Sequence, residues 1–151
     1  MRFIAKILCV LCLAGCGPDV ASWTGVYRGS GSINAGRQPE PLTGTLTANA
    51  DATFTLKSDP TGMQNRVWQC TLRASSATAE NVIFMVPTTC PISVMPDDGC
   101  MHQVTVNAAT VHRIAGSMEI DGQLSGRVSS TCTGMSGTTN DWLLEFVGRK
   151  L

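Results

Sequence analysis

Residues 114–128 read IAGSMEIDGQLSGRV, and apolar or small residues alternate with polar ones through most of this stretch. A period of two is typical of a β-strand that has one buried face. Asp121-Gly122 has the composition of a type I′ turn, so we predict a hairpin with strands at 111–120 and 123–131. Such a hairpin favours an antiparallel β-protein.

The same alternation continues in both directions from this hairpin, and helical spacing is absent from the segments around it. Short connections, such as NADA at 49–52 and NAAT at 107–110, separate these segments. We therefore predict an all-β fold, an antiparallel meander of eight or nine strands. The predicted strands cover residues 24–33, 42–49, 53–58, 66–73, 81–87, 101–107, 111–120, 123–131 and 141–149.

A weak repeat places a glycine between two larger apolar residues in the segments LTGTL, IAGSM and LSGRV, at Gly44, Gly116 and Gly126. Glycine weakens a flat strand and is more useful where a sheet bends sharply. The repeat therefore favours a small curled or closed β-barrel, with a β-sandwich as the alternative.

The first sixteen residues combine a basic start with an apolar run, ILCVLCLA, at 7–14. This order is typical of a secretory signal, and the run is too short to span a bilayer, which takes about 20 residues. Leu13-Ala14-Gly15-Cys16 resembles the lipobox of bacterial lipoproteins. The resemblance implies that residues 1–15 are a signal peptide and that Cys16 is acylated. Residues 16–22 would then be a short tether and 23–151 a single β domain.

The lipoprotein resemblance also implies a location in the cell envelope. Gly17 follows the cysteine, in place of the aspartate that resembles an inner-membrane retention signal, so we expect the outer membrane of a diderm bacterium. The partner implied in this way is the membrane, reached through covalent lipid. Six residues from Gly17 to Ser22 extend over about 20 Å at most, which would hold the domain near the bilayer.

The segment Trp23-Thr24-Gly25-Val26-Tyr27 faintly resembles the first strand of lipocalin-like barrels, which carry a tryptophan near a glycine. The order of the two residues differs from the lipocalin Gly-x-Trp pattern. The resemblance implies a barrel shape and says nothing about a ligand.

Seven cysteines are present, and the lipobox interpretation assigns three of them to the signal and the acylation site. The remaining four, an even number, predict two disulfides in an oxidising compartment. A hairpin centred near Met95 would place Cys90 opposite Cys100, which leaves Cys70 to pair with Cys132. Zinc ligation is the alternative, but the spacing of these cysteines lacks the close pairs typical of zinc sites.

Charge and motifs exclude several function classes. The chain has 11 Lys and Arg against 11 Asp and Glu, and the predicted signal removes Arg2 and Lys6, so the mature domain has a net charge near minus two. This balance, with scattered basic residues, argues against a nucleic-acid partner. His102 and His112 are predicted to lie apart, and no motif indicates a catalytic residue, a metal site or a cofactor.

The predicted loop between Cys90 and Cys100 is the most distinctive surface feature. Met95 and Met101 flank its acidic residues Asp97 and Asp98, and exposed methionines suit an adaptable contact. The alternative is that the methionines pack beneath the loop. We expect a lipid-anchored binding or interaction module for a small apolar ligand or an envelope protein. The other hypotheses are a structural surface lipoprotein and an unrecognised hydrolase.

Overall fold

The computed structural model describes residues 18–34, 38–60, 67–91, 100–132 and 137–151. Within these ranges the chain forms antiparallel strands, and no described segment is a helix of the length and hydropathy needed to cross a bilayer. The strands are β1 (Gly25–Asn34), β2 (Glu40–Ala48), β3 (Thr53–Ser58), β4 (Gln69–Ala77), β5 (Asn81–Phe84), β6 (Thr88–Pro91), β7 (Cys100–Arg113), β8 (Glu119–Cys132) and β9 (Thr138–Lys150).

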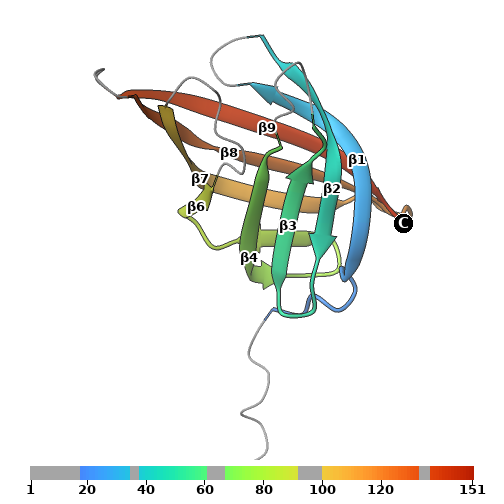
Figure 1. Ribbon diagram of the computed structural model, residues 1–151. Coiled ribbons are helices and arrows are strands. Elements are labelled where there is room, and N and C mark those ends of the chain that lie inside the picture. Colours follow the sequence, from blue (N-terminus) through green and yellow to red (C-terminus); the bar gives the residue numbers. More distant parts are fainter. Residues whose placement is uncertain (1–17, 35–37, 61–66, 92–99, 133–136) are drawn as a thin grey trace, which may run out of the picture.

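The strands form a closed barrel, as predicted (Figure 1). Their order is β5-β4-β3-β2-β1-β9-β8-β7, and the pairing of β5 with β7 closes the ring. The ninth strand, β6, continues along β7 beyond β5. Apart from the pairs β1–β9 and β5–β7, neighbours in the ring are consecutive along the chain, which is the arrangement of a meander.

The seam between β4 and β7 is closed in two different ways. In one half of the barrel, backbone hydrogen bonds connect β4 to β5 and β5 to β7. In the other half, β6 pairs with β7 alone, and a disulfide between Cys70 on β4 and Cys90 on β6 bridges the gap. The Cα atoms of this pair lie 5.0 Å apart. The disulfide therefore connects β4 to β6, two strands that are not paired by backbone hydrogen bonds.

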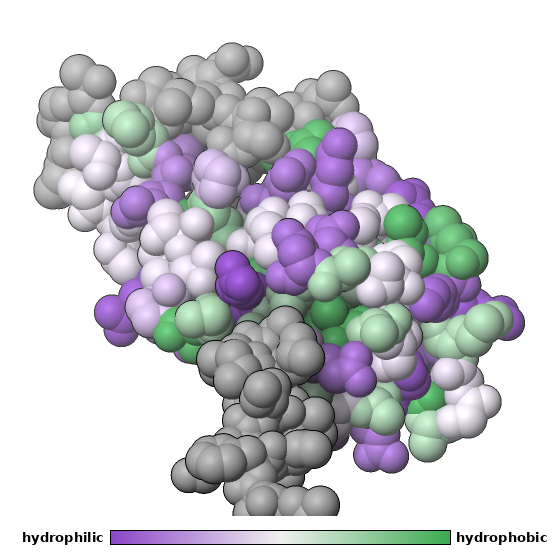
Figure 2. All heavy atoms as spheres, turned by 90° about the horizontal axis from the view of Figure 1, so that it is seen from below, coloured by the Kyte–Doolittle hydropathy of each residue, from purple (hydrophilic) through white to green (hydrophobic). Residues whose placement is uncertain are grey.

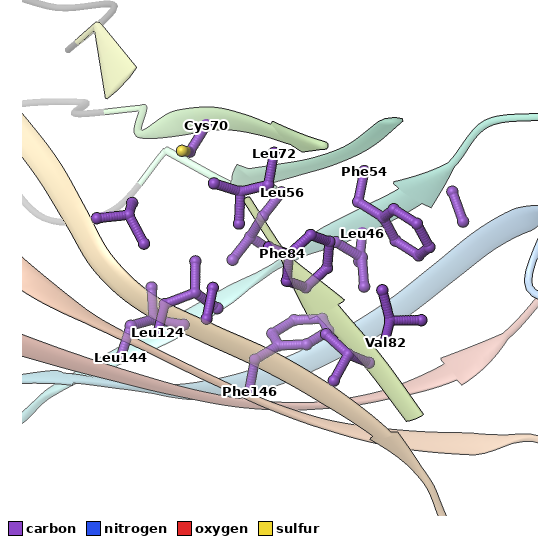
Figure 3. Close-up of a cluster of buried hydrophobic side chains, with 14 of the residues drawn as sticks. Leu46, Phe54, Leu56, Cys70, Leu72, Val82, Phe84, Leu124, Leu144 and Phe146 are labelled. Atoms are coloured by element: carbon purple, nitrogen blue, oxygen red, sulfur yellow. The ribbon is translucent and has the colours of Figure 1, made fainter. Parts of the chain in front are cut away.

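Apolar side chains from all the strands fill the described interior, as Figure 3 shows for β2 to β5, β8 and β9. Phe54 and Phe84 meet edge to face with their ring centroids 5.1 Å apart, an arrangement that aromatic quadrupoles favour. The largest fully buried side chains are Trp23, Tyr27, Phe54, Ile120, Leu144, Val82, Val106, Cys70 and Cys90.

The glycine prediction is right at two positions and wrong at the third. A Cβ at Gly44 or Gly126 would collide with a backbone carbonyl of the neighbouring strand, Lys57 or Thr105. Close approach of this kind accompanies a sharply bent sheet. Gly116 lies instead in the turn after β7, where its φ of +72° suits glycine.

The predicted turn at Asp121-Gly122 is wrong, because both residues lie within β8. The turn lies earlier, at 114–118, and joins two strands in which Val111 is opposite Gly122. A two-residue turn at 121–122 would have placed Ile120 opposite Gln123 and on the same face. Leu124 would then have faced away from Ile120, whereas the interior needs both side chains.

The predicted turn NAAT at 107–110 is also wrong, because β7 continues through it. The register with β8 shifts between Val106 and Ala108, which is a β-bulge. Interior positions change there from Val104 and Val106 to Ala109 and Val111. The alternation of buried and exposed residues is therefore broken by the one extra residue of the bulge, and the chain does not reverse its direction there.

The barrel has two ends, which we call the tether end and the loop end (Figure 1). The tether end contains residues 18–24 and the short connections at 49–52, 78–80 and 114–118. The loop end contains the last residues of β1, β3, β6 and β8 and the first residues of β2, β4, β7 and β9.

Trp23 plugs the tether end. Its side chain is fully buried, and its Nε1 donates a 2.7 Å hydrogen bond to the carbonyl of Thr78. The Arg113 guanidinium stacks 4.5 Å from the centre of the Trp23 ring and donates to the carbonyl of Ser22. Val20, within the stretch expected as a tether, is buried beside this plug. The tether end is therefore sealed by matched polar and apolar contacts.

Candidate functional site

Two tryptophans meet at the loop end, Trp68 just before β4 and Trp142 on β9. Their ring centroids are 6.1 Å apart, with the planes inclined at 66°. Trp142 is 5% exposed, whereas Trp68 is only partly buried. The half-buried side chains of Ile33 and Val128 also pack on the core. The pair therefore lies where the apolar interior ends.

Ser58 fixes the position of Trp68. It occupies an interior position at the end of β3 and is the one buried polar side chain identified among the described residues. Its Oγ accepts the Trp68 backbone N–H at 2.7 Å, and its own N–H donates to the Trp68 carbonyl at 2.8 Å. The two hydrogen bonds of Ser58, a polar residue at a core position, therefore fix the backbone of Trp68.

Trp142 carries an unmatched polar group. Its Nε1–H is buried and has no hydrogen-bond acceptor in the part of the chain that the structure describes. Leaving a buried donor unsatisfied costs about 1–3 kcal/mol, and such groups are rare in folded proteins. A buried indole nitrogen ordinarily finds a partner. The described residues of the site therefore present a hydrogen-bond donor that has no acceptor.

Polar residues follow the apolar ones along β7 and β8 at the same end. His102 and Ser130 occupy the register positions after Val104 and Val128, and they face each other across the strand pair. Their Nδ1 and Oγ atoms share a 2.7 Å hydrogen bond, and both side chains are half-buried. A polar layer therefore borders the apolar interior at the loop end.

The predicted separation of the two histidines is confirmed, although the predicted turn between them is absent. His112 lies ten residues from His102 on the same strand, about 33 Å away at the rise of a β-strand. It faces outward, and its Nδ1 hydrogen-bonds to Asn81 Oδ1. Its neighbour across the β7–β8 pair is Asp121.

A shallow groove of about 430 Å³ crosses the outer wall where His112 lies. In it the Gln123 amide donates to Glu145 at 3.4 Å, so the polar groups partly satisfy one another. All of its charged and amide side chains are exposed to water. The groove is lined by Thr110, His112, Asp121, Gln123, Glu145 and Val147, with Gly122 and Phe146 beneath them.

Asp59 connects three strands at the loop end. Its carboxylate accepts from Arg28 Nη1 at 2.8 Å and from the Thr43 hydroxyl at 2.7 Å. The Arg28 hydrogen bonds, followed by that of Thr43, hold the pKa of Asp59 below its ordinary value of 3.8. These partners keep the carboxylate charged, so its role is to connect the end of β3 to β1 and β2.

The predicted cysteine pairing is wrong. Cys70 is bonded to Cys90, and Cys132, which is also disulfide-bonded, lies directly opposite Cys100 in the β7–β8 register. The error came from the hairpin that joins β6 to β7. In the β6–β7 register Cys90 is opposite Val104 and not opposite Cys100.

The predicted contact loop is described only at its edge. Met101 lies on β7 with 66% of its surface exposed. Met95, Asp97 and Asp98 lie outside the described residues, as does Cys16. The sequence prediction did not single out Trp142. Its place two residues before Leu144 in an alternating segment signalled a buried aromatic residue, but not an unmatched donor.

No group of three or more His, Cys, Asp or Glu side chains converges as metal ligands would, within the described ranges. Comparisons of the chain with protein-family models, with curated proteins and with solved structures found no match. The candidate site therefore stands on its own geometry: an aromatic pair, a buried donor and a polar border at one barrel end.

Proposed function

We propose that this protein is a lipid-anchored binding module of the cell envelope. In this proposal Cys16 carries the acyl anchor, and the loop end of the barrel receives a small ligand. The lipobox-like segment supports the anchor. The contrast between a sealed tether end and a loop end with an unmatched donor supports the position of the ligand.

The single observation that carries the binding proposal is the buried Nε1–H of Trp142, which has no acceptor among the described residues. A ligand with an acceptor oxygen would satisfy this donor, and an aromatic or apolar body would pack against Trp68. Apolar side chains from the strands are buried in the described interior. In this proposal the ligand is small and lies across the loop end beside Trp68, above the apolar core.

The anchor is tested by replacing one atom, in Cys16→Ser. Cells are grown with a fatty-acid analogue that can be tagged after lysis. Labelled wild-type protein and unlabelled Cys16→Ser are expected, because a hydroxyl cannot replace the thiol in thioether formation. Equal labelling of the two proteins would contradict acylation at this position.

The binding site is tested with 1-anilinonaphthalene-8-sulfonate, whose aromatic body and sulfonate oxygens match the proposed ligand. We expect Trp142→Phe to weaken binding of this probe about tenfold, since the variant keeps an aromatic ring but loses the donor. Gln123→Ala, in the outer groove, is the control and should leave the affinity unchanged. An unchanged affinity in Trp142→Phe would refute the site, and weakening by Gln123→Ala would move it to the groove.

A structural envelope lipoprotein is the second candidate function, and the apolar core to which the strands contribute favours it. Native mass spectrometry of the protein purified from its own membrane separates the two. A binding module should retain a small molecule that the Trp142→Phe variant loses. A structural lipoprotein would show the acylated polypeptide alone in both cases.

A further inference from the structure

The rim of the tether end exposes four apolar side chains, which we call the apolar rim: Val26, Ile114, Met118 and Leu151. They are 38%, 40%, 57% and 83% exposed, respectively. Backbone hydrogen bonds place them next to one another. The Lys150 N–H donates to the Met118 carbonyl, and the Leu151 N–H donates to the Val26 carbonyl.

The rim lies, on the side of Ile114, next to the place where the chain enters the barrel. Val20 is buried at this end, and Arg113, next to Ile114, donates to the carbonyl of Ser22. Cys16 precedes Val20 by four residues, a span of about 14 Å at most. An acyl chain on Cys16 would therefore enter a bilayer within a short distance of the rim.

Charge does not account for the exposure of these side chains. The basic residues of this end, Arg113, Arg149 and Lys150, are accompanied by the acidic residues Asp19, Asp51, Glu80 and Glu119. Their net charge is minus one, so the rim is not a surface for an acidic partner. Figure 2, which views the molecule from below, shows green apolar side chains scattered among purple ones on this side. The rim is therefore a group of exposed apolar side chains with both acidic and basic side chains near it.

We propose that the apolar rim contacts the lipid bilayer at the boundary between headgroups and acyl chains. This inference rests on the proposed anchoring through Cys16 and adds a second contact to it. Apolar side chains at this boundary are removed from water, which favours the contact. The nearby lipid anchor already holds the domain at the membrane, so the contact does not bear the entropy cost of bringing the domain there. The barrel then stands with its loop end, and Trp142, away from the membrane.

Three exposed methionines at different heights on the barrel provide the test. Met118 is in the rim, Met85 follows β5 on the wall, and Met101 is at the loop end; their exposures are 57%, 53% and 66%. Met118→Trp, Met85→Trp and Met101→Trp are made in the full chain. Each acylated protein is reconstituted into phosphatidylcholine vesicles whose acyl chains carry bromine, a quencher of tryptophan fluorescence.

The expected result is loss of emission from the tryptophan at 118 and none beyond wild type from those at 85 and 101. Because the three substitutions are identical and their sites are similarly exposed, a difference reports height above the bilayer. Equal quenching at all three sites, quenching at 101 alone, or none at any site would overturn the rim contact.

Flotation of the same vesicles tests the anchor separately. Protein that floats but shows no quenching at 118 is anchored without rim contact, which overturns this inference and leaves the proposed function intact. Protein that does not float lacks the anchor, and both proposals then fail. If the tryptophan at 118 is instead shielded by a second copy of the chain, dilution of the protein in the vesicles restores its exposure, and the bilayer contact is refuted.

Discussion

Each end of the barrel contains a buried tryptophan, and the two differ in whether the indole N–H has a hydrogen-bond acceptor. At the tether end, Trp23 is fully buried, donates to Thr78 and lies against Arg113. At the loop end, Trp142 is 5% exposed, and its indole N–H has no acceptor among the described residues. The indole N–H of Trp23 has a hydrogen-bond acceptor, whereas that of Trp142 has none among the described residues. Buried polar groups are normally matched, so in the proposed function the loop end is the one that receives the ligand.

The ends also differ in how the barrel wall is closed. Near the tether end, β5 lies between β4 and β7 and pairs with both. Nearer the loop end, the Cys70–Cys90 disulfide spans the gap between β4 and β6. Backbone pairing holds strands along their whole length, whereas a disulfide holds them at one point. This difference leaves the loop end more dependent on individual side chains.

The largest expected effect comes from removing this disulfide. The double variant Cys70→Ala, Cys90→Ala should lower the free energy of unfolding by about 3 kcal/mol, because the bond closes a loop with a sequence separation of 20. Urea denaturation measures the change. A loss below about 1 kcal/mol would show that β6 keeps the seam closed without the covalent bond.

Peptide mapping without reduction is the control for that experiment. It should recover Cys70 joined to Cys90, and Cys132 joined to Cys100, its partner in the register. A fragment joining Cys90 to Cys100 would show that the β6–β7 register is different from the one described.

An intermediate effect is expected from one substitution made at both ends. Trp23→Phe loses a hydrogen bond, a cation–π contact and part of a filled volume, so it should destabilise by about 2 kcal/mol. Trp142→Phe loses volume but removes an unsatisfied donor, and these terms oppose each other, so the net change should stay within about 1 kcal/mol of zero. Chemical denaturation at neutral pH compares them. Equal losses would mean that Trp142 is satisfied in solution and would weaken the binding proposal.

The sequence predicted the strands better than the turns, for a physical reason. Alternation reports which side chains face inward, and this held from Ile120 to Leu124 although a turn was expected between them. A break in the alternation has two causes, a turn or a β-bulge, and the pattern does not distinguish them. At 107–110 the cause was a bulge, because only a continuous β7 pairs with β5, β6 and β8 together.

The candidate site was less accessible to sequence analysis. That Trp142 would be buried follows from its alternation with Leu144 and Phe146. That its nitrogen has no acceptor among the described residues depends on tertiary neighbours such as Trp68, which is distant in the sequence. The same dependence on distant neighbours explains the wrong cysteine pairing, since Cys70 and Cys90 meet only because β5 ends at Phe84.

The smallest expected effect compares an aspartate near each end. At the tether end, the Thr53 hydroxyl and then the Thr53 backbone N–H lower the pKa of Asp51; at the loop end, Arg28 and then Thr43 lower that of Asp59. A carboxyl whose pKa is lower in the folded state stabilises the protein above its unfolded value, near 3.8. That contribution disappears as the pH falls through the folded value. Both groups therefore support stability at neutral pH and cease to do so in acid.

The two aspartates differ in their sensitivity to salt, because Asp59 pairs with a cation and Asp51 bonds to neutral groups. Asp59→Asn should be slightly less stable than wild type at pH 7, and the difference should vanish as the pH falls below about 4. Arg28 and Asp59 are 47% and 32% exposed, so the effect is small. In about 1 M salt, where the Debye length is about 3 Å, it should shrink further, whereas that of Asp51→Asn should persist. Thermal unfolding across pH and salt measures both variants, and a salt-independent Asp59→Asn would show that the Thr43 hydroxyl, rather than Arg28, holds this carboxylate.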